Sequence, residues 1–288
     1  MIYIYLTIIF ILGLVIGSFL NVVIFRLETE EKIVNDRSKC PNCKHILSWK
    51  DLLPVLNYIS LKGRCRYCQK KISIQYPLVE LITASFFVFI FSHFFITTEK
   101  YFAVNILFYL FIISVFIVIS VYDLRHYIIP DKIIYPAVVI SIFYNLYIDT
   151  SLHFVIHSFF NGFEFFSQNL KLFFDFLFMN SVFTNHILAA FFSFGFFLAI
   201  IIFTKGKGMG GGDAKLGFLM GLILGWPLVF LAIFLASVLG SIIGVALIIG
   251  KKKKAKSMIP FGPFLVFGTV LSIFYGEEIV KLYFDLFL

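Results

Sequence analysis

The sequence predicts an all-α polytopic membrane protein with about eight transmembrane helices and a small cytoplasmic zinc-binding domain. Three observations lead to this fold class. The chain of 288 residues is 60% hydrophobic with a mean hydropathy of +0.98. Apolar runs of roughly 20 residues recur along it, and only one loop between them is long enough to fold by itself. A composition this apolar excludes an ordinary soluble domain.

Seven apolar runs are long enough to cross a hydrocarbon core of ~30 Å. They are 3–25, 78–97, 102–122, 132–148, 185–204, 228–249 and 262–284. A shorter run, 214–225, follows the glycine-rich loop that ends at Asp213 and gives the eighth expected helix. The first run lacks a basic flank and is too long for a signal peptide, so we expect it to remain as a helix.

The basic residues predict the orientation of these helices. Of the 24 lysine and arginine residues, 21 lie in four loops, 26–77, 123–133, 204–216 and 250–258, which alternating helices place on one side. By the positive-inside rule this side is the cytoplasm, and both termini lie outside. The net charge of +8 is then explained by topology and by anionic lipid headgroups, so we expect no nucleic-acid partner.

The loop 26–77 contains all four cysteines of the chain, as two Cys-x2-Cys pairs separated by 21 residues. Cys40, Cys43, Cys65 and Cys68 together supply four thiolates, which is the ligand set of a structural tetrahedral Zn²⁺ site. A loop of this size without a core needs such a metal for stability. Disulfides or free thiols are the alternatives, and a reducing cytoplasm argues against disulfides. His45 is a further, weaker ligand candidate.

Two acidic residues, Asp123 and Asp213, lie at the ends of apolar runs, where an ionisable side chain is costly without a function or a partner. Asp213 could simply cap the helix that follows it, and Asp123 could pair with Arg125. Together, however, they lie on the same membrane face. Two carboxylates in one site share a proton and can activate water for attack on a peptide carbonyl. The pair therefore indicates aspartic-protease chemistry.

At these and other positions the chain resembles the bacterial type IV prepilin peptidases, which are aspartic proteases with a Gly-x-Gly-Asp motif. The matching motifs extend along almost the whole chain: Gly17-Ser-Phe-Leu-Asn-Val22, Gly63-Arg-Cys-Arg66, Tyr76-Pro-Leu-Val-Glu-Leu81, Ile129-Pro-Asp131 after Asp123, Gly210-Gly-Gly-Asp-Ala-Lys215 and Ile259-Pro-Phe-Gly-Pro263. The resemblance implies that Asp123 and Asp213 form the catalytic dyad and that the four cysteines belong to a cytoplasmic domain.

The resemblance also implies the activity. Family members remove the short basic leader of prepilins or pseudopilins, after a glycine, at the cytoplasmic face of the bacterial inner membrane. Bifunctional members then methylate the new N-terminal amine with S-adenosylmethionine, in support of type IV pili or type II secretion. No motif marks the methyl-donor pocket, and Glu80 is only a candidate because it lies near the bilayer beside the cysteine loop. The oligomeric state is not predicted.

The expected domains are the first transmembrane helix (1–25), the four-cysteine domain (26–77) and a membrane peptidase domain (78–288). The last contains a Phe-rich insert, 149–184, which we expect outside the cell as amphipathic pieces at the bilayer interface. A different class of function stays open, namely an ion- or proton-coupled transporter with a zinc-ribbon regulatory domain. Such a transporter is expected to have acids near the bilayer midplane and repeated half-helices.

Two finer expectations concern helix ends and glycines. Asp213 begins a helix and Asp123 ends one, so their helix dipoles favour an ionised Asp213 and a protonated Asp123. In the first helix, Gly13 and Gly17 are four residues apart, a spacing that lets a neighbouring helix approach closely.

Overall fold

The computed structural model of the protein describes residues 2–29, 37–96, 102–149, 181–206, 208–250 and 259–287. The chain divides into two compact units, Met1–Val121 and Tyr122–Leu288. In the described ranges all regular secondary structure is helical, and β-pairing is limited to two isolated bridges. The all-α fold class is therefore confirmed.

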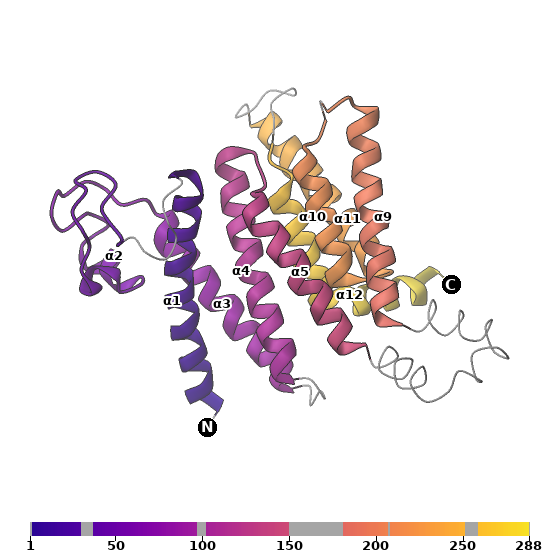
Figure 1. Ribbon diagram of the computed structural model, residues 1–288, viewed down its shortest axis with the longest axis horizontal. Helices are drawn as coiled ribbons and strands as arrows, with labels where there is room; N and C mark the ends of the chain where they lie inside the picture. Colours follow the sequence, from indigo (N-terminus) through magenta and orange to yellow (C-terminus); the bar gives the residue numbers. More distant parts are fainter. Residues whose placement is uncertain are drawn as a thin grey trace. The chain divides into compact units, whose positions relative to one another are not determined.

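In unit 1, helices α1 (Ile2–Thr29) and α3 (Gln75–Ile96) lie side by side and antiparallel (Figure 1). Their backbones touch at two glycines. A Cβ atom on Gly13 would lie 2.5 Å from the Ala84 Cα, and one on Gly17 would lie 2.6 Å from the Glu80 Cα. Any side chain at either position would push the helices apart, so the expected close approach at these two glycines is confirmed.

The cysteine loop between α1 and α3 carries two short helices, η1 (Trp49–Leu52) and α2 (Leu56–Ser60). The next long helix, α4 (Phe102–His126), crosses the boundary between the two units. Its last turn, which contains Asp123, belongs to unit 2.

Unit 2 is built around a short central helix. α10 (Gly211–Leu224) packs against α5 (Asp131–Ile148), α9 (Val182–Phe203), α11 (Leu228–Ile249) and α12 (Gly262–Phe287) (Figure 1). Nine of its 14 residues are buried. Glycines allow this packing: a Cβ on Gly221 would lie 2.3 Å from the Ala190 Cα of α9.

Seven helices in the described ranges are long and apolar enough to cross a membrane, and they correspond to the seven long runs of the sequence. The eighth run forms α10, whose 14 residues extend for only about 21 Å at 1.5 Å per residue. This length is shorter than a ~30 Å hydrocarbon core. Seven long helices and the short, buried α10 thus make up the eight helices that the sequence predicts.

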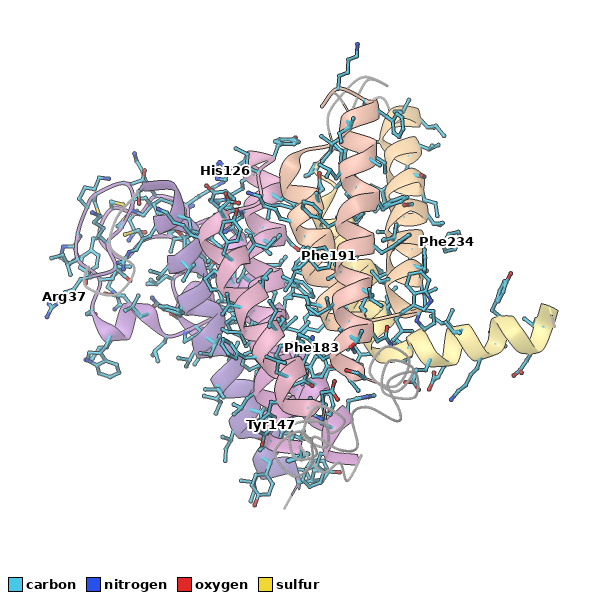
Figure 2. The ribbon with its side chains drawn as sticks, turned by 45° about the vertical axis from the view of Figure 1, so that its right-hand side comes forward. Arg37, His126, Tyr147, Phe183, Phe191 and Phe234 are labelled. Atoms are coloured by element: carbon cyan, nitrogen blue, oxygen red, sulfur yellow. The ribbon has the colours of Figure 1, made fainter. Side chains whose placement is uncertain are left out.

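Large apolar side chains point away from the helix packing of unit 2. Phe191 on α9 and Phe234 on α11 are 62% and 64% exposed, and Phe234 projects from the outer edge of the helices in Figure 2. Exposed aromatic and aliphatic side chains of this kind are what a surface in contact with lipid requires, because lipid tails are as apolar as leucine.

The Phe-rich insert lies almost entirely outside the described residues, as does the basic run 251–254. The structure describes only the two ends of the insert, and hydrogen bonds join these ends. The buried carboxylate of Asp149 accepts hydrogen bonds from the Ser181 hydroxyl and, at 2.9 Å, from the backbone N–H of Phe183. The expectation of an interfacial, amphipathic insert stays a prediction.

Candidate functional site

Asp123 is held at the end of α4 by a backbone group from far along the chain. Asp123 is buried and only 4% exposed. The N–H of Gly262, the first residue of α12, donates to the Asp123 Oδ2 at 3.0 Å. The first N–H groups of a helix have no partner within the helix, so this carboxylate satisfies one of them.

Gly262 is required at this contact by space. A Cβ atom at this position would lie 2.6 Å from Oδ2 of Asp123, closer than real Cβ atoms approach an oxygen. Gly262 of the Ile259-Pro-Phe-Gly-Pro263 motif thus helps to hold the Asp123 carboxylate, a role that the sequence alone did not reveal.

Asp213 is half-buried in the first turn of α10. Its Oδ2 accepts the backbone N–H of Gly210 at 3.1 Å. Burial raises the pKa of this carboxyl group to about 6, against the opposing effect of the Gly210 hydrogen bond, and the negative charge of Asp123 raises it further. The two carboxylates, 90 positions apart in the sequence, therefore lie within electrostatic reach of one another.

Both carboxylates receive a backbone N–H from the start of a helix, α12 for Asp123 and α10 for Asp213. The positive end of a helix dipole therefore acts on each of them. From the sequence, each aspartate could be related only to its own helix, and the contribution of α12 to Asp123 could not be foreseen. Helix dipoles therefore do not favour ionisation of one aspartate over the other. The expected order, with an ionised Asp213 and a protonated Asp123, stays a prediction that the helix dipoles do not support.

Asp213 is not the cap residue that the sequence left open, because α10 begins at Gly211 and its N-cap is Gly210. As the third residue of the helix, Asp213 instead accepts the N–H of that N-cap. This role does not compete with chemistry. A hydrogen bond from one N–H orients one carboxylate oxygen and leaves the other for water, and a carboxyl group with a pKa near 6 can exchange a proton near neutral pH.

The motif around Asp131 packs directly on the motif around Asp213. A Cβ on Gly212 would lie 2.9 Å from the Ile129 Cβ, so the two segments can touch only because residue 212 is glycine. Lys215 then donates to Asp131 Oδ1 at 2.6 Å. Both charged groups are partly exposed, so the ion pair contributes only about 0–1 kcal/mol. Its effect is to fix the start of α10 relative to α5.

A second candidate site lies in the cysteine loop of unit 1. The Sγ atoms of Cys40, Cys43, Cys65 and Cys68 all lie within 4.8 Å of one another. The measured Sγ separation between Cys40 and Cys68 is 3.9 Å. Zn–S bonds of ~2.3 Å in a tetrahedron require sulfur atoms roughly 3.8 Å apart. The structure thus brings together all four predicted ligands with spacing that fits a metal ion.

The two cysteine pairs have the same backbone geometry. The N–H of Cys40 donates to the carbonyl of His45, and the N–H of Cys65 donates to that of Lys70, both at 2.9 Å. In each pair the fourth residue after the first cysteine has a positive φ, 59° at Lys44 and 57° at Gln69. Two matching turns therefore present their thiols to one point.

The thiol of Cys40 is prepared for deprotonation. Burial opposes its ionised form, but hydrogen bonds from the backbone of Cys43 and Asn42 lower its pKa to about 7. A thiol must lose its proton to bind a metal. The group of side chains that could hold the metal consists of the four cysteines and does not include His45. The His45 ring instead packs on the Tyr67 ring, with 3.7 Å between the ring centroids.

Asp51 joins the second cysteine pair to the rest of the loop, a role that no motif indicated. Its carboxylate accepts from Arg66 Nε at 2.8 Å and from the Tyr67 hydroxyl at 3.0 Å. Its backbone carbonyl accepts from Asn57 at 2.6 Å. Hydrogen bonds from Ser48 hold the pKa of Asp51 below its ordinary value against the effect of burial. Glu80 lies in unit 1 on α3, where its carboxylate accepts the backbone N–H of Val55 in the cysteine loop.

Comparison with known proteins gives independent support for a relation to leader peptidases. Residues 11–94 match the model of the bacterial peptidase A24 N-terminal domain, and residues 110–245 match that of the type IV leader peptidase family. These segments contain the cysteine loop and both aspartates, respectively. No solved structure matches the chain.

Among curated proteins, a prepilin leader peptidase/N-methyltransferase of Bacillus subtilis is 29% identical over 279 residues, which cover 96% of this chain and 97% of the relative. Proteins of the same name from Myxococcus xanthus and Vibrio cholerae are 40% and 34% identical over shorter segments. These segments span 38% and 57% of the two relatives and 46% and 49% of this chain.

Proposed function

Because the chain belongs to the type IV leader peptidase family, we propose that Asp123 and Asp213 hydrolyse the peptide bond that joins a leader to a type IV prepilin or pseudopilin. The family is one of aspartic peptidases, so the chain is an enzyme. The observation that carries the residue assignment is the pair of carboxylates in unit 2, each oriented by an N–H at a helix start and coupled by charge. The transporter alternative has no comparable support.

The chemistry follows from the sharing of one proton between two acids. The ionised carboxylate accepts a proton from water, and the water oxygen attacks the scissile carbonyl carbon. The protonated carboxyl group donates to the carbonyl oxygen as negative charge develops there.

The position of the pair at helix ends fits a substrate with a basic leader followed by an apolar helix. Such a substrate places its scissile bond at the membrane boundary, where the basic leader stays in water and the apolar part in lipid. Placement of the bond beside the carboxylates then supplies much of the selectivity. We assign this boundary to the cytoplasmic face of the bacterial inner membrane.

We further propose that the chain methylates the new N-terminal amine, as the names of its relatives indicate for those proteins. S-adenosylmethionine would supply the methyl group. Zn²⁺ would be held by Cys40, Cys43, Cys65 and Cys68 and would stabilise the cysteine loop, because four thiolates leave no open position for a substrate.

The function is tested by adding the purified protein in lipid nanodiscs to a purified prepilin with its leader. Mass spectrometry should find the leader removed and, with S-adenosylmethionine present, one methyl group on the new N-terminus. A product shortened at another bond, or no product with several prepilins, would contradict the assignment.

The pH dependence of cleavage should report the proton that Asp123 and Asp213 share. The pKa of about 6 at Asp213 includes the effect of an ionised Asp123, so it is the pH at which the pair loses this proton. kcat/KM should therefore fall as the pH rises through about 6, because no carboxyl group is then left to donate to the scissile carbonyl. A carboxyl group with its ordinary pKa would place this loss near pH 4. A profile that is flat from pH 5 to 7 would exclude this shared proton from the reaction.

The orientation of the protein in the membrane can be tested by labelling single introduced cysteines in cells whose membrane is intact. Residues 26–77 and 204–216 should react only after the membrane is permeabilised, and residues 149–184 should react from outside, because 21 of 24 basic residues lie on the first side. Labelling of the cysteine loop from outside would place the carboxylate pair in the wrong compartment.

Loss of one thiolate should release the metal. Cys65→Ser is expected to lower bound zinc from about one equivalent to near zero, because Cys65 is buried and all four thiols converge. Elemental analysis measures the zinc, and limited proteolysis measures the order of the loop. Ser60→Ala, an exposed change in the same loop, is the control. A fully reduced, active protein without zinc would refute the site.

A further inference from the structure

A carboxylate without a positively charged partner is buried between the two helices of unit 1. Glu80 on α3 is only 7% exposed. Its Oε2 accepts the backbone N–H of Val55 at 2.8 Å, and the Ser18 hydroxyl of α1 also binds its carboxylate. No lysine, arginine or histidine in the described ranges pairs with it.

Neutral partners offset only part of the cost of burying an ionised carboxylate, so such a group either takes up a proton or binds a cation. Ionisable residues at membrane depth tend to have a function and a partner. A cation bound beside Glu80 would therefore stabilise the carboxylate form of this residue.

A second acceptor without a partner lies on the same helix interface. Asn21 is 3% exposed, and its amide nitrogen donates to the carbonyl of Tyr76 at 3.1 Å and to that of Gly17 at 3.3 Å. These two carbonyls fix which end of the amide is nitrogen, because only the NH₂ group can donate to them. The amide oxygen, Oδ1, is buried and accepts no hydrogen bond from the residues that the structure describes.

The antiparallel packing of α1 and α3 places these two groups one helical turn apart. Gly17 lies against the backbone of Glu80, and Asn21, one turn further along α1, binds the carbonyl of Tyr76, one turn before Glu80. The two residues thus share one face of the interface, and both offer oxygen acceptors.

The loop segment that closes this face is strained. Val55 has φ 58° and ψ −49°, in a region that a β-branched residue rarely adopts. Its N–H points to the Glu80 carboxylate at 2.8 Å, and this contact holds the segment in place. Backbone strain of this kind persists where surrounding contacts enforce it, often at binding sites.

We propose that Glu80 and the Asn21 Oδ1 form a binding site for a protonated primary amine, the new N-terminal α-amino group of the cleaved pilin. The inference rests on the proposed function and extends it by locating the site that recognises the methyl acceptor. An ammonium group has three donors and no acceptor, so it complements a site with only acceptors left to fill. An α-amino group has a pKa of roughly 7.7–8.0 and is mostly protonated at neutral pH.

A divalent metal is a poorer match for these groups. Ca²⁺ takes six to eight oxygen ligands and Mg²⁺ about six. One carboxylate and one amide oxygen on two close-packed helices do not approach such a set. A single ammonium group needs only two or three acceptors, which is what the pair of residues supplies.

The first test uses the wild-type protein in nanodiscs and two short synthetic peptides with the sequence of a mature pilin N-terminus. One peptide has a free α-amine and the other is N-acetylated. The free-amine peptide should bind at least about tenfold more tightly, the usual effect of a charge-assisted hydrogen bond. Equal binding of the two peptides would overturn the proposal without any variant.

The second test removes the charge and keeps the shape. Glu80→Gln retains an oxygen for the Val55 N–H, so it should remove the preference for the free amine and lower methylation while leaving leader cleavage unchanged. Glu278→Gln, an exposed change of the same kind on α12, should keep the preference. Asn21→Leu removes the second acceptor and should weaken binding of the free-amine peptide alone.

Zinc content and thermal unfolding of each variant establish that the fold is retained. A preference for the free amine that persists in Glu80→Gln would overturn the proposal. Prepilin cleavage, measured on the same wild-type preparation, reports the proposed function separately: if cleavage occurs and the two peptides bind equally, only the amine site is wrong.

Discussion

Asp123→Asn and Asp213→Asn are each expected to reduce leader cleavage by at least about 10³-fold. An amide has nearly the same shape as a carboxyl group but can neither accept a proton from water nor donate one to the scissile carbonyl. The hydrogen bonds from Gly262 and Gly210 reach carboxylate oxygens, and the asparagine oxygen can still accept them, so the fold should be retained. The rate is measured with purified prepilin and mass spectrometry.

The control for these two variants is Glu277→Gln, which also replaces a carboxyl group with an amide but at an exposed position of α12. It should leave the cleavage rate unchanged. Methylation of a substrate that has already been cleaved should survive both aspartate replacements. Cleavage by either variant at close to the wild-type rate would remove that aspartate from the reaction.

Gly262→Ala is expected to lower cleavage by about 10²-fold even though no chemical group is lost. The added Cβ would lie 2.6 Å from the Asp123 Oδ2, so the carboxylate must move or lose its N–H partner. A displacement of ~1 Å at a catalytic group can cost about two orders of magnitude in rate. Kinetics at saturating prepilin should place the loss in kcat.

Gly195→Ala, on α9, is the matched control, because a Cβ at this position has no neighbour within 4 Å. It should leave cleavage unchanged and, by removing a helical glycine, raise stability by up to roughly 1 kcal/mol. If Gly262→Ala retains full activity, the contact between α12 and Asp123 has no part in catalysis.

The long apolar runs predicted seven helices with good accuracy, because a bilayer allows few ways to satisfy a backbone. The predicted and observed ends differ by only a few residues, for instance 132–148 against Asp131–Ile148. The structure of the eighth run was harder to predict. Its composition does not reveal that α10 is short and buried on nearly all sides, since that depends on glycines that let α9 approach.

The four thiol ligands could be predicted from spacing, since two Cys-x2-Cys turns leave little choice of geometry. The aspartates could be identified as unusual, but not their surroundings. The contact between Gly262 and Asp123 joins residues 139 positions apart, and the contact between Val55 and Glu80 joins a loop to a helix. Such contacts depend on tertiary packing, on which local pattern gives no information.

The register of α1 and α3 has a consequence for how the cysteine loop could have entered the chain. Asn21 of α1 and Tyr76 in the first turn of α3 are joined by a hydrogen bond of 3.1 Å, and the glycine contacts hold the helices together beyond it. The ends of the intervening segment are thus fixed near one another by the helices themselves. A segment with adjoining ends can be exchanged like a module, and the loop-closure entropy of a short turn in its place is small. The helix pair should therefore fold as a hairpin without the module, and modules with other ligands could be inserted at the same point.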